Sequence, residues 1–406
     1  MSRKPLVVVL GFLGRMPVAG VAWQLLHYLE GFRRLGCEVY YVEDTGDWPY
    51  DPEQNCVTGD CRYSVTYLTR LLGAHGLGER WAYRAAPDNG RLYGLTESWL
   101  TEVFRRADAL VNLTGGTVLR EEHLRVPVRI YLETDPVLPQ IEVACGRPFT
   151  IHLLEAHTHL FSFGENFGSP DCGVPLIRFR YLPTRQPVIL DWWQDGGPIP
   201  PHASLSLSGG KGSVSGAGDR FTTVANWRQS GKDIEWQGER YAWSKHLEFL
   251  KFLELPRRSD QSFELALSCD DPGALDLLRT HGWRVVEALA LSREVEPYRD
   301  YIRASRGEFT VAKDQNIRLL SGWFSDRSAC YLAAGRPVLT QDTGFGNVLP
   351  TGRGLFGFST MEDVLAALDA IRGDYEGHCR AAREIAAEYF AAEKVVGSLM
   401  ERAGLA

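Results

Sequence analysis

A buried strand, a glycine loop and an amphipathic helix follow one another at the start of the chain. Residues 6–10 are a continuous apolar run of the kind that is buried on both faces of a parallel sheet, and the glycine loop 11–20 comes next. Apolar side chains then recur at three- and four-residue spacing from Val21 to Phe32, and Gly36 ends this helix before a second strand. This order predicts a βαβ unit, which restricts the N-terminal half of the chain to an α/β fold.

The alternation of strands and helices continues along the chain. Further predicted elements of the first half are a helix at 97–106 and strands at 109–113, 128–132 and 159–163. Residues 196–218 are dense in Gly, Ser and Pro without periodicity, so they predict a linker, and the alternation resumes beyond it. Because 406 residues exceed the roughly 100 to 200 of an ordinary domain, we predict α/β domains at 1–195 and 219–380, followed by a helix at 381–406.

The composition narrows the class of partner and the compartment. A formal net charge of −7 disfavours nucleic acid, which is bound through clustered positive charge. The cysteines form no CxxC pair and predict free thiols in a reducing compartment. No apolar run approaches the roughly 20 residues that span a bilayer, and the first apolar run reads as a strand rather than a signal peptide. We therefore expect a cytoplasmic protein with small-molecule partners; its oligomeric state stays open.

The segment 322–345, GWFSDRSACYLAAGRPVLTQDTGF, has well-defined helix signals. Ser325 is a suitable N-cap for a helix over 326–334, and Gly335 is a suitable left-handed stop. The helix N-terminus offers unpaired N–H groups, and Arg327 in its first turn adds a cation, so a diphosphate would bind here. The alternative is a capped helix with a surface arginine.

This segment resembles the C-terminal, donor-binding domain of GT-B glycosyltransferases, especially bacterial family-1-like (group-1) members. The resemblance is carried by Trp323 and Ser325, by the small-residue helix, by the run 333–338 and by 342–345. It implies two Rossmann-like domains that face each other across a cleft, with the last helix crossing back to the N-terminal domain. It also implies a metal-independent hexosyltransferase that uses a nucleoside diphosphate sugar, UDP above all, and an acceptor hydroxyl or amine.

The donor-binding residues that we predict combine this resemblance with the helix argument. They are Gly14, Lys245, Lys313, Ser325, Asp326, Arg327, Asp342, Thr343, Gly344 and Phe345. Cys330 stands where many relatives place a ribose-binding glutamate, and Gly322 stands at the first position of the paired-glutamate motif of retaining members. The ribose contacts and the stereochemical course therefore stay open. We expect Arg327→Ala to abolish nucleotide binding and to leave the melting temperature of the free protein nearly unchanged.

Residues that follow the strands of the first half are the acceptor-side candidates, because ligands collect beyond the carboxyl ends of strands in open α/β sheets. Arg15, Glu43, Asp44 and Asn166 are the predicted acceptor contacts. Asp135 and Glu165 are the predicted catalytic bases for the acceptor proton, although either could be a turn or capping residue.

Three other motifs give weaker evidence for function. Residues 133–135, Glu-Thr-Asp, echo the metal-binding DxD of the other glycosyltransferase fold, which lacks a second α/β half. His152, His157 and His159 lack further support as metal ligands, and the sequence around Lys211 has an incomplete P-loop spacing. Two alternative functions keep the fold: a sugar-nucleotide epimerase or hydrolase, and a non-catalytic sugar-nucleotide-binding protein.

Overall fold

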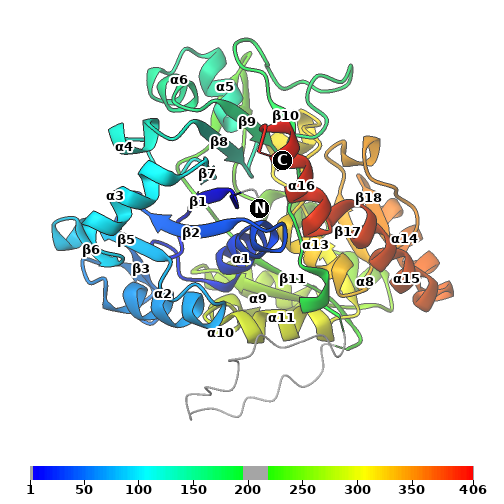
Figure 1. Ribbon diagram of the computed structural model, residues 1–406. Helices are drawn as coiled ribbons and strands as arrows, with labels where there is room; N and C mark the ends of the chain where they lie inside the picture. The colour runs from blue at the N-terminus through cyan, green and yellow to red at the C-terminus, as the bar shows by residue number, and fades with distance from the viewer. Residues whose placement is uncertain (1–2, 195–217, 406) are drawn as a thin grey trace.

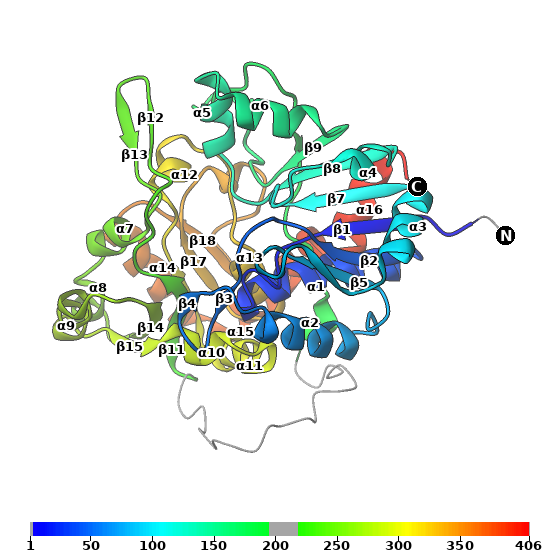
Figure 2. The same ribbon diagram turned by 90° about the vertical axis from the view of Figure 1, so that its left-hand side faces the viewer.

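The structure is a computed structural model that describes residues 3–194 and 218–405. Two α/β domains are each built around a largely parallel sheet (Figures 1 and 2). In Figure 2 the blue and cyan strands of the N-terminal domain lie on the right, and the second domain lies on the left. The predicted linker 196–218 falls outside the described residues except for Gly218.

The N-terminal sheet has eight strands in the order β10-β9-β8-β7-β1-β2-β5-β6. Their bounds are β1 Leu6–Leu10, β2 Glu38–Glu43, β5 Trp81–Ala85, β6 Arg91–Gly94, β7 Ala109–Leu113, β8 Val128–Glu133, β9 His159–Ser162 and β10 Leu182–Pro183. All neighbouring strands are parallel except β5 and β6. A short hairpin of β3 (Tyr50–Asp51) and β4 (Cys56–Val57) stands apart from this sheet. The carboxyl ends of β1, β7 and β8 thus lie side by side.

Strand β1 is buried on both faces, as its sequence predicts. Val7 and Val9 belong to the core that includes α1, whereas Leu6, Val8 and Leu10 pack in the core on the α3 side. The helices of this domain are α1 Ala19–Arg34, α2 Arg62–Ala74, α3 Glu97–Arg106, α4 Glu121–Leu124, α5 Leu138–Ala144 and α6 Pro148–Glu155, with 3₁₀ turns η1 Ala86–Asp88 and η2 Leu190–Trp192.

The C-terminal sheet has six parallel strands in the order β15-β14-β11-β16-β17-β18. Their bounds are β11 Arg220–Asn226, β14 Ser262–Ser268, β15 Arg284–Glu287, β16 Gly307–Thr310, β17 Val338–Gln341 and β18 Leu355–Phe358, and a separate hairpin joins β12 Ile234–Trp236 to β13 Glu239–Tyr241. The helices are α7 His246–Lys251, α8 Leu255–Arg258, α9 Pro272–Thr280, α10 Ala288–Ser292, α11 Val295–Ala304, α12 Asp314–Arg318, α13 Asp326–Ala333 and α14 Met361–Gly373, with a 3₁₀ turn η3 at Phe345–Asn347. Aromatic side chains such as Phe221, Phe263 and Phe309 fill the core of this domain.

The end of the chain crosses back to the N-terminal domain, as expected from the resemblance. The path consists of α15 (Tyr375–Ile385), the π-helical turn η4 (Ala386–Phe390) and α16 (Ala392–Arg402). The backbone N–H groups of Val188 and Ala392 form hydrogen bonds across the crossing, the first to the Phe390 carbonyl at 2.7 Å and the second to the Val188 carbonyl at 3.0 Å. Helix α16, red in Figure 1, then packs along α1. The crossing ties the two domains together.

A packed interface joins the domains beside the cleft described below. Helix α1 packs against α11, and the indole N–H of Trp23 donates to the carbonyl of Val295 at 2.9 Å. All eight cysteines are free thiols. Within residues 3–194 and 218–405, no helix has both the length and the apolar character needed to cross a membrane.

Candidate active site

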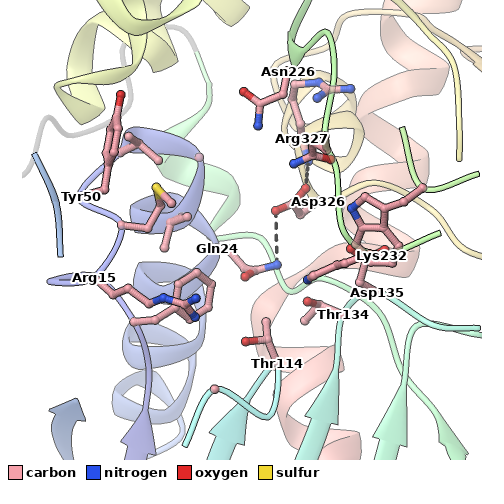
Figure 3. A pocket seen from close by; sticks show the side chains of 18 of the residues that line it. Arg15, Gln24, Tyr50, Thr114, Thr134, Asp135, Asn226, Lys232, Asp326 and Arg327 are labelled. Carbon is pink, nitrogen blue, oxygen red and sulfur yellow. Dashed lines mark hydrogen bonds between the residues drawn. The ribbon is translucent and has the colours of Figure 1, made fainter. Parts of the chain in front are cut away.

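A cleft of about 1030 Å³ lies between the two domains. Loops after β1, β2, β7 and β8 form its N-terminal wall, and loops after β11 and β14 together with the start of α13 form the opposite wall. Figure 3 shows Arg15 and Tyr50 on one side, and Asn226, Lys232 and Arg327 on the other. The cleft therefore lies where strand ends of both sheets face each other, which is the usual ligand position in open α/β sheets.

Lys245 is the cleft cation with the fewest internal partners. It immediately precedes α7, and its Nζ lies 5.1 Å from the ring centroid of Trp323. No carboxylate of the described residues pairs with this half-buried ammonium group. Burial, together with the charges of Arg327 and Lys313, lowers the pKa of Lys245 to about 7. Lys245 is thus an unneutralised cation that an anionic ligand would stabilise.

Arg327 is held from within its own domain instead of lying on the surface. Its Nε donates to Glu308 at 2.6 Å, and its two Nη atoms donate to the Val224 carbonyl at 2.6 Å and to the Thr310 hydroxyl at 2.9 Å. Burial lowers the pKa of Arg327, but the Glu308 carboxylate outweighs burial and raises it above its ordinary value. Three of the five guanidinium N–H groups are therefore used internally, and two are left for a ligand.

The first turn of α13 carries its own acidic group. Ser325 occupies the predicted N-cap position, yet its side chain makes no capping hydrogen bond. Asp326 accepts a hydrogen bond from the Arg327 backbone N–H at 2.8 Å and from the Gln24 amide at 3.3 Å across the domain interface (Figure 3). Burial raises the pKa of Asp326. A phosphate at this helix end would meet Asp326, so Lys245 is the better placed phosphate ligand.

Asp135 and Lys313 form an ion pair across the cleft. Lys313 lies nearly buried, with its Nζ 3.2 Å from the ring centroid of Trp243, and burial lowers its pKa. Asp135 lines the cleft, whereas Lys313 does not. One oxygen of Asp135 pairs with Lys313, and the other is buried without a hydrogen-bond partner. This second oxygen therefore has unused hydrogen-bonding capacity, but it is buried in this conformation.

The turn at 342–345 supports the cleft without lining it. The Asp342 carboxylate accepts from the Gly344 backbone N–H at 2.9 Å, and the Thr343 hydroxyl donates to the Trp323 carbonyl at 2.6 Å. Phe345 is buried in the core. This turn thus supports the loop that leads into α13, and direct donor contacts by its four residues stay a prediction.

Gly322 and Cys330, the two positions where the chain departs from the glycosyltransferases it resembles, both lie in packed surroundings. Gly322 has a φ of +81°, and a Cβ atom there would lie 2.3 Å from the backbone nitrogen of Asn166. A glutamate could not occupy this position without moving the backbone. Cys330 is buried and faces α1, with its Sγ 3.9 Å from Nε2 of His27. Neither residue lines the cleft.

The Glu43 carboxylate holds the glycine loop through backbone hydrogen bonds. Its carboxylate accepts from the backbone N–H groups of Gly14 at 2.5 Å and Arg15 at 2.6 Å, and from the hydroxyl of Tyr41 at 2.6 Å. Burial raises the pKa of Glu43 to about 7 despite these donors. Arg15 lines the cleft and pairs with Asp47 at 3.1 Å. Of the predicted acceptor contacts, Arg15 therefore reaches the cleft and Glu43 positions its loop.

Asp44 lies outside the cleft despite its position after β2. Its carboxylate accepts a hydrogen bond from Arg84 at 3.1 Å and pairs with Arg120. This nearly buried residue joins the end of β2 to β5 and to the segment between β7 and α4, and its predicted acceptor contact would require those ion pairs to open.

Glu165 and Asn166 also lie outside the cleft lining. Glu165 pairs with Arg185 at 2.6 Å, and burial raises its pKa. The Asn166 amide donates to the Leu320 carbonyl at 2.8 Å and accepts from the amide of Asn347 at 2.8 Å, both in the other domain. These contacts make Glu165 an ion-pair partner and Asn166 a domain link, and they leave Asp135 as the candidate base inside the cleft.

Glu133 is a cleft residue that we did not select from the sequence. It accepts from the Gln140 amide at 2.9 and 3.0 Å and from the hydroxyl of Ser162. Burial raises its pKa to about 8. Its place at the carboxyl end of β8, two residues before Asp135, was the available sequence signal.

The three histidines of the weak metal motif do not line the cleft. His157 is buried, with its Nδ1 2.8 Å from the Leu153 carbonyl, and burial lowers its pKa to about 4. Among the residues that the structure describes, no three His, Cys, Asp or Glu side chains converge on a metal position. The sequence around Lys211 lies outside the described residues.

Comparison with solved structures gives the fold. No family sequence model matches the chain, and no curated protein matches it by sequence. An alpha-glucosyltransferase solved with UDP and DNA is 9% identical with a TM-score of 0.55, and the alignment covers 100% of both chains. HepE from Anabaena, solved with UDP and glucose, is 10% identical with a TM-score of 0.55, covering 99% of this chain and 100% of HepE. Sucrose-phosphate synthase from Thermosynechococcus elongatus is 13% identical with a TM-score of 0.53, covering 98% of this chain and 99% of the synthase. The chain therefore has the GT-B fold, with two Rossmann-like domains facing across the cleft.

Proposed function

We propose that the protein transfers a hexose-type sugar from a nucleoside diphosphate donor, preferably a UDP-sugar, to an acceptor hydroxyl or amine in the cleft. The GT-B fold supports this reaction, and two proteins of similar fold were solved with UDP. The single observation that carries the proposal is Lys245, a cleft ammonium group that lacks a carboxylate partner among the described residues. The eight free cysteines support a cytoplasmic location.

The donor phosphates would take Lys245 as their principal ligand. The two remaining N–H groups of Arg327 and the exposed Lys232 border the same wall. When the bond between the anomeric carbon and the phosphate oxygen breaks, the nucleoside diphosphate gains negative charge, and these cations would stabilise it. Since protein cations supply this stabilisation, we propose a metal-independent reaction, and turnover should persist in EDTA.

Asp135 would accept the proton of the acceptor. The acceptor oxygen or nitrogen forms a bond to the anomeric carbon, its proton passes to the Asp135 carboxylate, and the nucleoside diphosphate leaves. The position of Asp135 in the cleft and its pairing with Lys313 support this role. An epimerase or hydrolase of the same fold would instead consume the donor without any acceptor, so donor turnover is measured with and without acceptor.

A thermal-shift screen with UDP, GDP, TDP and ADP tests the donor site, because a ligand that binds the native state raises the melting temperature. We expect the largest shift with UDP and its loss in Lys245→Met. Lys251→Met is the matched control, because Lys251 is the last residue of the helix that Lys245 precedes, lies outside the cleft lining, and pairs its exposed ammonium group with Glu248. The absence of a shift with every nucleotide would refute the proposed donor site, and an undiminished shift in Lys245→Met would refute the role of Lys245.

A further inference from the structure

The cleft has more room than a sugar nucleotide needs. Ligand sites for one small molecule typically measure about 300 to 1000 Å³. At about 1030 Å³ this cleft lies at the top of that range. Lys232 and Lys245, which have no carboxylate partner among the described residues, belong to the C-terminal wall together with Arg327, whereas Arg15 on the N-terminal wall is paired with Asp47. The N-terminal wall is therefore left for the acceptor.

Apolar side chains line part of this N-terminal wall, beside polar and charged ones. We define the apolar wall as Phe12, Met16, Val118, Leu138 and Phe149, all of which line the cleft. They stand on the loops after β1 and β7 and at the starts of α5 and α6, and α5 follows β8; β1, β7 and β8 are neighbours in the sheet. The ring of Phe12 also lies near Gly116 of the β7 loop, and α5 packs against α6. The five side chains thus come from neighbouring elements of one wall.

Two members of the apolar wall are unusually exposed. Phe149 is 66% exposed and Val118 is 56% exposed, although both side chains are large and apolar. Single exposed apolar residues are common in soluble proteins, but a contiguous set that rims a cleft marks a binding surface. These two residues are therefore positioned to lose water contact when a ligand enters.

The charges on this wall are already paired. Arg15 pairs with Asp47, and Asp135 pairs with Lys313. Glu133 is hydrogen-bonded to Gln140 and Ser162. The wall consequently offers an ionic acceptor no free counter-charge, and it would favour a neutral group.

From these features we infer that the acceptor is a small neutral alcohol or amine that carries a compact apolar group, such as an aromatic ring, which rests on Phe12, Val118 and Phe149. This inference rests on the proposed function and specifies its second substrate. The reacting hydroxyl or amine would point toward Asp135, and the apolar group would lie away from the C-terminal cations.

Isothermal titration with two glucosides that differ only in the aglycone tests the inference. In the presence of UDP, we expect 4-nitrophenyl β-D-glucoside to bind at least about tenfold more tightly than methyl β-D-glucoside, because the ring buries apolar area. The double variant Val118→Ser/Phe149→Ser should reduce this ratio to about threefold or less. Phe149→Leu should keep the preference, and Leu277→Ser, an exposed apolar residue of α9 outside the cleft lining, should leave it unchanged.

The outcomes separate this inference from the donor-site proposal. Equal affinities for the two glucosides, binding of neither, or an unchanged ratio in the double variant would overturn the apolar acceptor. The melting-temperature shift with UDP should be the same in the double variant and the wild type. A wild-type protein that prefers the nitrophenyl glucoside but does not bind UDP would contradict the donor site alone.

Discussion

Lys245 and Arg327 lie near each other at the cleft, but they differ in what neutralises them. The Arg327 charge is matched by Glu308, whose side chain is fully buried, and fixed by two further hydrogen bonds. The Lys245 ammonium faces two other cations and has no ion-pair partner in the described part of the chain. A charge that is already compensated contributes to folding, whereas an uncompensated one favours the binding of an anion.

The pH dependence of the melting temperature of the unliganded protein should reveal the lowered pKa of Lys245. The pKa of Lys245 falls from its ordinary value of 10.5, which we take for the unfolded chain, to about 7 in the folded state. Below pH 7 the side chain is charged in both states, so its buried charge lowers the free energy of unfolding by the full amount. As the pH rises from 7 toward 10.5, the folded protein loses this proton first and the penalty decreases. We expect Lys245→Met to raise the melting temperature at pH 6, with a difference from wild type that shrinks toward pH 10. A difference that is constant with pH, or one that matches the Lys251→Met control, would contradict the lowered pKa.

Arg327→Ala should unfold the protein more easily, which revises the expectation from the sequence. Removing the guanidinium group leaves Glu308 as an unpaired carboxylate inside the C-terminal domain, and such a loss costs about 3 to 5 kcal/mol. Urea unfolding would measure the change. The double variant Arg327→Met/Glu308→Gln should recover a large part of it, because the uncompensated charge is gone. An unchanged unfolding midpoint in Arg327→Ala would show that the ion pair is not needed for the fold.

At the scale of elements, the loop between α12 and α13 carries close contacts between the two domains. Gly322 adopts a left-handed conformation, and the Asn166 amide of the other domain contacts the Leu320 carbonyl two residues earlier. The N–H of Gly322 donates to the carbonyl of Thr343 at 2.7 Å. A close approach between the domains therefore occupies the position of Gly322.

Gly322→Ala should destabilise the protein by about 1 to 3 kcal/mol, because it adds an unfavourable φ and a collision with the Asn166 backbone. Gly373→Ala is the matched control. Its added methyl group would meet no atom within 4 Å, so stability should be equal or slightly higher. Chemical denaturation compares the two variants, and equal midpoints would contradict the close approach.

At the scale of the whole molecule, the two walls of the cleft carry different parts of the reaction. The C-terminal wall carries the cations for the donor. The N-terminal wall carries Asp135 and the five apolar side chains defined above. The ion pair between Asp135 and Lys313 spans them, and α16 and the interface between α1 and α11 join the domains outside the cleft. This arrangement would bring the acceptor and the donor together when the domains close.

Asp135→Asn should lower kcat by about 10²-fold or more at saturating donor while UDP binding persists, because general base catalysis typically contributes about 10² to 10⁴-fold. Glu165→Gln is the control, since Glu165 lies outside the cleft and pairs with Arg185. The kcat of Glu165→Gln, calculated per folded molecule, should stay within a few-fold of wild type. Equal losses in both variants would mean that Asp135 acts through folding rather than through proton transfer.

The sequence by itself determined the elements and their order. The apolar run at 6–10 predicted β1, the capping signals around Ser325 and Gly335 predicted α13 to within one residue, and the alternation predicted two α/β domains. These signals are local, because periodicity and capping depend on residues a few positions apart. The predicted continuous last helix was interrupted by the π-helical turn at the crossing, where tertiary contacts with the N-terminal domain compete with the local pattern.

Only the tertiary structure decided which charged side chains are free. Arg327 meets a carboxylate 19 positions away, and Asp135 meets an ammonium 178 positions away in the other domain. Glu165 was as plausible a base as Asp135 in the sequence, yet the fold pairs it with Arg185 outside the cleft. Because an ion pair depends on where strands of different domains end, no local spacing could show that Lys245 is left without a carboxylate and that Arg327 is not.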